Sequence, residues 1–272
     1  MNLLILTNNE TEVDGLTEHF DQWDHYSLAD AKISHKDTTT TAAVEGTPIT
    51  EYDAVYLNPE PRAAIYAKTF LETIQDHHIQ TNMDSTALFL MMKRHYLFHV
   101  LHQRDVNIPQ TIAFSTEKAL TEIEDDIEFP AVAKMYEQFT SAGMKTIDDS
   151  DDLHSFAQSA NHEENVIILQ EYVDGDVYDV LYIDGDLVSL ELEGDAWHLD
   201  NNDKIQYSKL STEQSKAVNE TAQAIGTKMC RVRLIGNTIV GVENEPRLDL
   251  FQEHSGKNVY GKVADMLRGD DD

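Results

Sequence analysis

The sequence has few of several residue types, and each shortage excludes something. It has a single cysteine, Cys230, which excludes a framework of internal disulfides. No apolar run approaches the roughly 20 residues that span a bilayer, so no contact with a membrane is expected. The first residues, Met1 to Thr7, lack the basic region of a signal peptide and have the pattern of a β-strand. We therefore expect a cytoplasmic protein.

Basic residues are also scarce. Lysine and arginine number 20 against 50 aspartates and glutamates, which gives a formal net charge of −30. The acidic residues are scattered, and only the stretch from Asp270 to Asp272 forms a purely acidic block. Such a distribution indicates a solvated acidic surface, as in proteins of a high-salt cytoplasm, and it disfavours nucleic acid as a partner. The alternative interpretation is a platform for a cationic partner.

The length of 272 residues suggests about two domains. Residues 1–81 alternate between strand and helix patterns, which favours a small α/β domain with a parallel sheet. Its expected elements are strands at 3–6 and 52–57 and helices at 12–20 and 62–77. The threonine-rich stretch from Thr38 to Ala43 is interpreted as a loop.

Residues 82–175 contain a combination that suits a nucleotide. A helix is expected from Ser85 to Arg104, and the apolar strand from Phe129 to Lys134 ends in a lysine that offers a point charge to phosphate. A loop of small residues, 138–144, could lay backbone N–H groups over the same phosphates. The strand from Val166 to Val173 ends in Glu-Tyr-Val, where an edge backbone could meet an adenine ring. Further helices are expected at 116–123 and 150–159.

Residues 176–272 complete the predicted fold. Strands are expected at 178–183 and 187–192, followed by a polar loop over the site at 194–207. The pattern of residues 211–226, which Gly226 ends, is that of a helix, and a short helix is expected at 261–267. Between these two helices the sequence predicts a hairpin of strands 231–235 and 238–242.

Three histidines, His95, His99 and His102, fall on one face of the expected helix at 85–104. A histidine pair four residues apart can hold zinc. No cysteine or carboxylate lies between them on that face, so we favour a structural role in a helix packed between domains. The zinc site remains the alternative.

The ordered set of Lys134, the small-residue loop and Gln170 to Val173 resembles the ATP-grasp superfamily, in particular its RimK-like carboxylate–amine ligases. Asn82, Lys93 and the stretch from Ile108 to Thr111 match the sequence that precedes the nucleotide domain in that family. The resemblance implies a small N-terminal parallel α/β domain (1–81) and an ATP-grasp fold of two α+β sub-domains (82–175 and 176–272).

The resemblance also implies ATP and Mg²⁺ as cofactors, and small carboxylate and amine substrates or a peptide as partners, with a homo-oligomer possible. The implied site residues are two phosphate contacts, an adenine-binding segment with a ribose acceptor, and magnesium ligands. In that order they are Lys93 and Lys134; Gln170, Glu171, Tyr172 and Val173, with Asp179 or Glu171 for the ribose; and Glu243, Asn244 and Glu245.

The sequence departs from the family pattern at the implied metal site. Arg231 and Arg233 stand where the family has an aspartate, and the order Glu-Asn-Glu differs from the family's Glu-x-Asn. An arginine there would repel Mg²⁺, or would neutralise a phosphate in its place. Two functions follow. The first is an ATP-dependent ligase that joins a carboxylate to an amine through an acyl phosphate. The alternative is a degenerate, non-catalytic ATP-grasp protein that acts as a nucleotide-binding or structural module.

Overall fold

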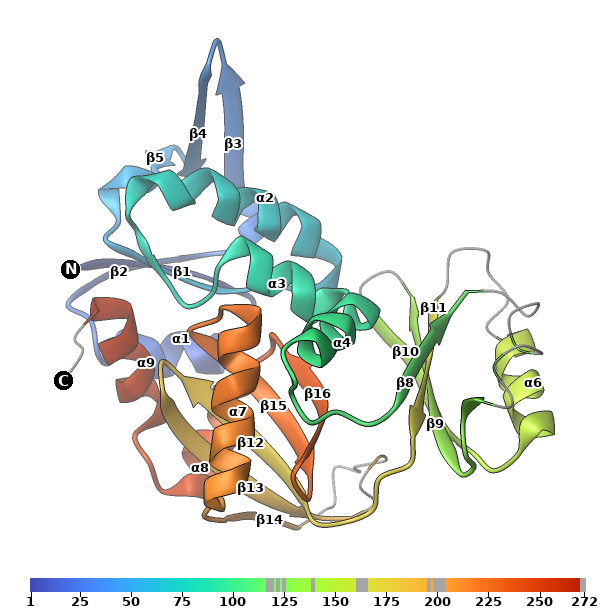
Figure 1. The fold of residues 1–272 in the computed structure, drawn as a ribbon. Helices are drawn as coiled ribbons and strands as arrows, with labels where there is room; N and C mark the ends of the chain where they lie inside the picture. The colour runs from blue at the N-terminus through green and yellow to red at the C-terminus, as the bar shows by residue number, and fades with distance from the viewer. Residues whose placement is uncertain are drawn as a thin grey trace.

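The computed structural model describes residues 1–115, 120, 123, 126–137, 140–159, 166–194, 197 and 204–269. Three main sheets and a small hairpin sheet organise this part of the chain (Figure 1). The first and third sheets face each other with helices packed between them, further helices cover their outer faces, and the second sheet extends to one side. No helix in the described ranges is long and apolar enough to cross a membrane.

The first sheet is entirely parallel and has the strand order β2-β1-β6-β7. Its strands are β1 (Asn2–Thr7), β2 (Gln22–Tyr26), β6 (Ala54–Asn58) and β7 (Gln80–Thr81). Helix α1 (Glu10–Thr17) follows β1, and α2 (Ala64–Ile74) follows β6. Apolar side chains on both faces of β1 are buried, as expected for a strand covered on both sides. The predicted parallel α/β arrangement is confirmed.

A hairpin projects from this sheet as a two-stranded arm (Figure 1). It is formed by β3 (Ala31–Lys36) and β4 (Thr39–Val44), and the short β5 (Thr47–Pro48) pairs with β4. The prediction of a loop from Thr38 to Ala43 was therefore wrong, since Thr39 onward forms a strand. The β-branched threonines suit a pleated strand, and β4 is further fixed by burial of Ala42 and Val44.

The predicted helix from Ser85 to Arg104 is two helices, α3 (Ser85–Met92) and α4 (Arg94–Gln103). They meet at Lys93, whose φ of −103° and ψ of 72° are not helical. No glycine or proline marks this break in the sequence. Because of this break, Arg94 is the first residue of α4.

The second sheet is antiparallel, with the order β10-β9-β11-β8. Its strands are β8 (Thr111–Phe114), β9 (Ala131–Glu137), β10 (Thr140–Ile147) and β11 (Val166–Glu171). Helix α6 (Ser150–Ser159) packs on one face through Leu153 and Phe156. The predicted small-residue loop at 138–144 was wrong from Thr140 onward, where β10 begins. Residues 138 and 139, and most of the predicted helix at 116–123, lie outside the described residues.

The third sheet is also antiparallel, with the order β14-β13-β12-β15-β16. Its strands are β12 (Val177–Ile183), β13 (Asp186–Glu193), β14 (Lys204–Tyr207), β15 (Met229–Ile235) and β16 (Thr238–Glu243). The predicted hairpin of β15 and β16 is confirmed. The predicted loop at 194–207 was wrong at its end, which is β14. Of the rest, the structure describes only Gly194 and Trp197.

Helices cover both faces of the third sheet. Helix α7 (Thr212–Ile225) packs on one face, with Ser211 forming a capping box at its start and Gly226 in the left-handed conformation at its end. Helices α8 (Leu248–Ser255) and α9 (Val259–Arg268) lie on the other face. There they form one continuous core with the first sheet, in which Leu3 and Tyr56 pack with Leu181 and Phe251. The division at residues 81 and 175 remains a prediction.

Candidate functional site

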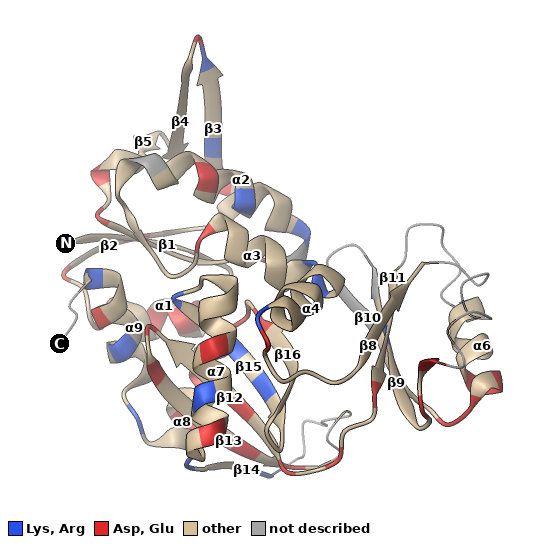
Figure 2. Ribbon diagram, in the orientation of Figure 1, with Lys and Arg blue, Asp and Glu red and all other residues tan. Residues whose placement is uncertain are grey.

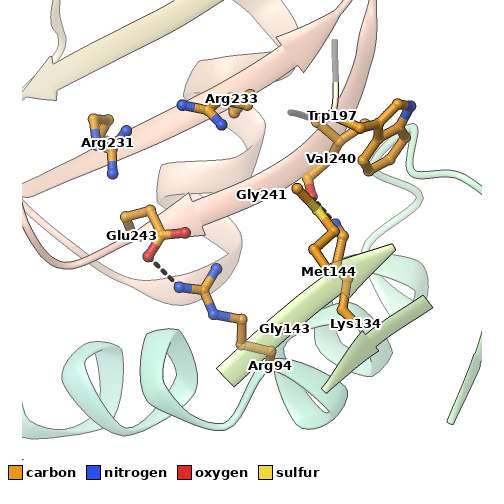
Figure 3. Close-up of a pocket in the computed structure, with 10 residues that line it drawn as sticks. All are labelled: Arg94, Lys134, Gly143, Met144, Trp197, Arg231, Arg233, Val240, Gly241 and Glu243. Carbon is orange, nitrogen blue, oxygen red and sulfur yellow. Dashed lines mark hydrogen bonds and ion pairs between the residues drawn. The ribbon is translucent and has the colours of Figure 1, made fainter. Parts of the chain in front are cut away.

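A cavity of about 220 Å³ lies where the second sheet, the third sheet and helix α4 meet (Figure 3). Strands β9 and β10 form one wall, and strands β15 and β16 form the other. The side chains and backbone that line it come from several stretches, the most distant of which are 149 residues apart in the sequence. They are Arg94, Lys134, Gly143, Met144, Trp197, Arg231, Arg233, Val240, Gly241 and Glu243.

Lys134 bridges the two walls. Its Nζ donates to Oε1 of Gln170 on the adjacent strand β11, at 2.6 Å, and to the backbone oxygen of Val240 on β16, at 3.1 Å. Gln170 is itself fixed, because its Nε2 donates to Oγ1 of Thr111 at 2.9 Å. The ammonium group also lies 4.6 Å from the centre of the Trp197 ring, within cation–π range.

Burial changes the acidity of Lys134. The side chain is only 6% exposed, and desolvation, followed by the nearby positive charge of Arg94, lowers its pKa to about 7. The carboxylate of Glu243 acts in the opposite direction, but its effect is smaller than that of burial. Near neutral pH this lysine can therefore gain a proton when an anion arrives.

Asp179 holds two arginines in the wall formed by the third sheet. It lies on β12 directly opposite Arg233 of β15 and is 1% exposed. Its Oδ1 accepts from Nε of Arg233 at 2.8 Å, and its Oδ2 accepts from Nη2 of Arg233 at 3.0 Å and from Nη1 of Arg231 at 2.9 Å. Burial on its own would raise the pKa of Asp179, but the two guanidiniums more than offset it and lower the pKa.

Arg94 and Glu243 form a second ion pair across the cavity (Figure 3). Arg94 begins α4, and Glu243 ends β16, where it is paired with Arg231 in the strand register. Arg94 also donates from Nη1 to the backbone oxygen of Val242 at 3.3 Å. Desolvation of Glu243 would raise its pKa, but the charges of Arg94, then Arg231 and Arg233, lower it, so this carboxylate stays ionised.

The cavity is cationic in a strongly acidic chain. Among the described residues, its lining has four basic side chains, Arg94, Lys134, Arg231 and Arg233, and one carboxylate, Glu243. Figure 2 shows the basic residues on β15 among the acidic residues of the third sheet. Guanidinium groups fixed by carboxylates in this way are suited to planar, bidentate contacts with an oxyanion such as phosphate.

The structure brings some of the sequence-predicted residues to this site and places others elsewhere. Lys134 lines the cavity, and Gln170 lies directly behind it. Lys93 is not among the lining residues, whereas its neighbour Arg94 is. Asp179 is bound by two guanidiniums and does not present its carboxylate to the cavity.

The predicted adenine segment lies next to Trp197. The Val173 carbonyl accepts from the indole Nε1 of Trp197 at 3.0 Å, and the ring of Tyr172 lies 6.3 Å from that of Trp197. Glu171 is exposed, and its Oε2 accepts from the backbone N–H of Gln110 at 3.3 Å. Trp197 is 2% exposed, so its ring fills the space beside this segment.

The predicted metal ligands do not converge. Glu243 lines the cavity in its ion pair with Arg94, Asn244 is half-buried outside the lining, and Glu245 is exposed. Glu245 contributes its backbone oxygen, which accepts from Nε of Arg231 at 3.2 Å. In the part of the chain that the structure describes, no group of three or more histidines, cysteines, aspartates or glutamates could hold a metal ion.

The same finding bears on the three histidines of α4. His95, His99 and His102 form no metal-binding group within the described residues, and His99 stacks on Tyr96 of its own helix at 6.0 Å. The choice between a structural role and a zinc site held by a histidine pair remains a prediction.

Sequence reasoning missed two residues of the cavity. Arg94 directly follows Lys93, so the sequence contains a basic pair but does not show which of the two residues lines the cavity. The break between α3 and α4 decides that. Trp197 was placed in a polar loop over the site, but nothing local to it predicts contact with Lys134 or Val173.

A second cavity, of about 350 Å³, lies in the first sheet beyond the carboxyl ends of β1 and β6. Its polar lining includes Thr7, Asn8, Ser27, Asn58 and Glu60. Its lining, as far as the structure describes it, contains no lysine or arginine. It is therefore poorly suited to a polyphosphate.

Comparison with known proteins identifies the fold. No protein-family model matches the sequence, and no curated protein matches it either. Among solved structures, a RimK-domain ATP-grasp protein from Sphaerobacter thermophilus aligns over 99% of this chain and 100% of its own, with a TM-score of 0.74 and 16% identity. The chain has the ATP-grasp fold.

Two further structures with this fold are complexes. The ATP-grasp ligase PsnB, complexed with a minimal precursor, Mg and ADP, covers 98% of this chain and 97% of its own, with a TM-score of 0.74 and 12% identity. D-alanine–D-alanine ligase from Bacillus anthracis, complexed with ATP, covers 99% and 97%, with a TM-score of 0.69 and 14% identity. Identities this low establish the ATP-grasp fold alone. The predicted resemblance and fold class are confirmed.

Proposed function

We propose that this chain is an ATP-dependent ligase that joins a carboxylate to an amine. The observation that carries the proposal is the cationic cavity between the second and third sheets of an ATP-grasp fold. Four basic side chains converge there in a chain whose net charge is −30. Burying so many cations together is unfavourable unless an anion joins them, and a nucleoside triphosphate supplies that charge.

The proposed roles follow from position. The phosphates are held by the four basic side chains of the cavity, Arg94, Lys134, Arg231 and Arg233. The edge from Gln170 to Val173 receives the adenine, and Glu171, exposed at the end of β11, accepts hydrogen bonds from the ribose. Arg94 takes the place that the sequence suggested for Lys93, and Glu171 takes the ribose contact because Asp179 is already bound by two guanidiniums.

The chemistry is a pair of group transfers. A substrate carboxylate oxygen attacks the γ-phosphorus of ATP, the bond to the β–γ bridging oxygen breaks, and ADP leaves. The amine nitrogen then attacks the carbonyl carbon of the acyl phosphate, inorganic phosphate leaves, and the nitrogen loses a proton. The residues of the cavity contribute by orienting the phosphates and neutralising their charge.

Magnesium is the other cofactor that the resemblance implies, and it accompanies ADP in the PsnB complex. Here the fit of the residues is poor, because one carboxylate, already paired with Arg94, lies among three guanidiniums. In nucleotide sites Mg²⁺ is held by one or two carboxylates together with phosphate oxygens and water, and the carboxylate in the described lining, Glu243, is not free for that role. The proposed scheme therefore passes through no metal ion.

The substrate class is left at a carboxylate and an amine, either small molecules or groups on a peptide. The PsnB structure contains a precursor, which favours a peptide substrate for a fold of this shape. Product analysis can distinguish the two, since a peptide substrate is recovered with its mass lowered by one water for each bond formed within it.

Phosphate release in concentrated KCl, with pools of amino acids and carboxylate-rich peptides, tests the proposal. We expect ADP and phosphate to form only when both substrate groups are present, together with an amide whose mass is that of the substrates less one water. Lys134→Met is expected to reduce the rate by roughly 100-fold. Arg104→Gln, which removes an exposed charge at the other end of α4, is the control. ATP binding without turnover on any pair would contradict a ligase.

A specific observation favours a second candidate, a non-catalytic module. The Val173 carbonyl, which the proposal assigns to adenine, is occupied by the indole N–H of Trp197. If that contact is permanent, ATP cannot bind as proposed. Tryptophan fluorescence during ATP titration distinguishes the two: displacement of Trp197 changes the emission, and Trp197→Phe, which lacks the N–H, should then bind ATP more tightly. An unchanged spectrum and no ATP binding by either protein would favour the non-catalytic module.

A further inference from the structure

The cavity contains one feature that the proposed function does not require, which is its excess of guanidinium over carboxylate. A polyphosphate in a protein is usually neutralised by a divalent cation that carboxylates hold. In the described part of the chain, the carboxylate that lines the cavity and the aspartate behind its arginines are both bound by guanidinium groups. Asp179 is bound through both oxygens by Arg231 and Arg233, and Glu243 is bound by Arg94.

We propose that the guanidinium groups of Arg94, Arg231 and Arg233 neutralise the bound phosphates in place of a divalent cation held by the protein. The inference rests on the proposed function, since it concerns the phosphates of the same nucleotide. It goes further in assigning the neutralising charge to side chains of this chain, which makes phosphate binding independent of Mg²⁺.

Asp179 orients two of the three guanidiniums. It faces Arg233 in the strand register, and Arg231 lies two residues away on the same strand, so both reach one carboxylate from the same side. A buried carboxylate bound in this way fixes their rotamers before any ligand arrives. An arginine pair held rigidly loses little entropy when it binds an oxyanion.

Donors remain for that oxyanion. Arg231 uses Nε and one N–H of Nη1 in its two bonds, and Arg233 uses Nε and one N–H of Nη2. A guanidinium has five N–H donors, so about three on each group are left in the described structure. Both side chains line the cavity (Figure 3), and a phosphate there can accept from both.

The third guanidinium lies on the opposite side. Arg94 reaches across from α4 to Glu243, so its charge lies on the far side of the cavity from Arg233. A divalent ion near Glu243 would have to approach all three positive groups and displace one of them. Each of these groups repels a cation, and the repulsion is twice as large for a divalent ion as for a monovalent one at the same separation. An anion in the same position is attracted by all three guanidinium groups.

Isothermal titration of ATP into the full chain, once with Mg²⁺ and once with EDTA, tests the inference. We expect the two dissociation constants to agree within about threefold, because the protein's neutralising charge does not change. Arg233→Lys keeps the charge and the pairing with Asp179 but lacks the planar fork, so it should weaken binding about tenfold in both buffers. Loss of at least about tenfold in affinity on removing Mg²⁺ from the wild type would overturn the inference.

Two further variants guard against misfolding and non-specific charge effects. Arg94→Gln combined with Glu243→Gln removes the ion pair as a whole and leaves no unpaired buried charge, and we expect weaker binding in both buffers. If this double variant instead binds as the wild type does, Arg94 has no part and the inference as stated fails. Arg104→Gln, at the exposed end of the same helix, is the matched control and should bind normally.

The same titration separates failure of the inference from failure of the proposed function. If ATP does not bind in either buffer, the proposed function fails, and tripolyphosphate is titrated in its place. Binding of tripolyphosphate that ignores Mg²⁺ and weakens in Arg233→Lys would support the arginine site without the nucleotide. Absence of tripolyphosphate binding would overturn the inference as well.

Discussion

The ammonium group of Lys134 donates one hydrogen bond to the side-chain oxygen of Gln170, at 2.6 Å, and a second to the backbone oxygen of Val240, at 3.1 Å. The first contact is within the second sheet and the second is to the third sheet. A single buried side chain thus connects the two walls of the cavity. Its protonation should affect both stability and ligand binding.

Lys134→Met should change how stability depends on pH. The pKa of Lys134 is lowered to about 7 in the folded chain, whereas an unfolded lysine titrates near 10.5. Between these values the unfolded state binds more protons, so the unfolding free energy of the wild type rises with pH relative to the variant. The unfolding free energy of Lys134→Met should therefore exceed that of the wild type by the largest amount below about pH 7. Urea denaturation at a series of pH values measures this difference, with Lys216→Met, at an exposed position, as the control. Unfolding free energies of wild type and Lys134→Met that depend on pH in the same way would contradict the prediction.

Nucleotide binding should be accompanied by proton uptake. A phosphate beside Lys134 favours its charged form and raises its pKa from about 7, so up to about half a proton is taken up at pH 7. Titration calorimetry in two buffers that differ in ionisation enthalpy measures this number directly. The uptake should vanish in Lys134→Met. Equal uptake in the two proteins would mean that another group titrates.

Asp179→Asn should be strongly destabilising. The substitution leaves Arg231 and Arg233 without their common counter-charge at a position that is 1% exposed, and breaking a buried ion pair costs about 3–5 kcal/mol. Glu193→Gln, which breaks the exposed pair with Lys204, is the matched control and should cost less than about 1 kcal/mol. Chemical denaturation gives both values. Equal losses of unfolding free energy in the two variants would show that the burial of Asp179 does not determine its contribution to stability.

Stability should rise with ionic strength. A net charge of −30 causes repulsion across the surface, and screening strengthens as the Debye length falls from about 30 Å at 0.01 M salt to about 3 Å at 1 M. Circular dichroism during dialysis from concentrated KCl into dilute buffer should show loss of structure. A spectrum that stays the same would contradict this expectation.

Much of the fold was predictable because local signals agreed with it. The apolar stretch of β1, the capped helix α7 and the hairpin of β15 and β16 each follow from patterns within about 15 residues. Lys134 and Gln170 were identified together because their order along the sequence resembles that of the ATP-grasp family, and the structure places them on the neighbouring strands β9 and β11. Their direct bond is a consequence of the strand register, which places Lys134 opposite Ile168.

The rest of the site depends on contacts that no local pattern encodes. Asp179 and Arg233 are 54 residues apart, and only the pairing of β12 with β15 reveals that the aspartate holds the arginine. Arg94 was missed because the break at Lys93 has no glycine or proline to signal it. The β4 strand was interpreted as a loop because its threonines are polar, although their β-branched side chains suit a strand.

The central claim is that the cavity formed by Arg94, Lys134, Arg231 and Arg233 holds the phosphates of ATP. A crystal structure with a non-hydrolysable ATP analogue, prepared in EDTA, tests it most directly. The account predicts phosphate oxygens within hydrogen-bond distance of the Arg231 and Arg233 guanidiniums, with Asp179 still bound to both. Phosphates elsewhere, for example in the second cavity beside Thr7, or no bound nucleotide at saturating concentration, would contradict it.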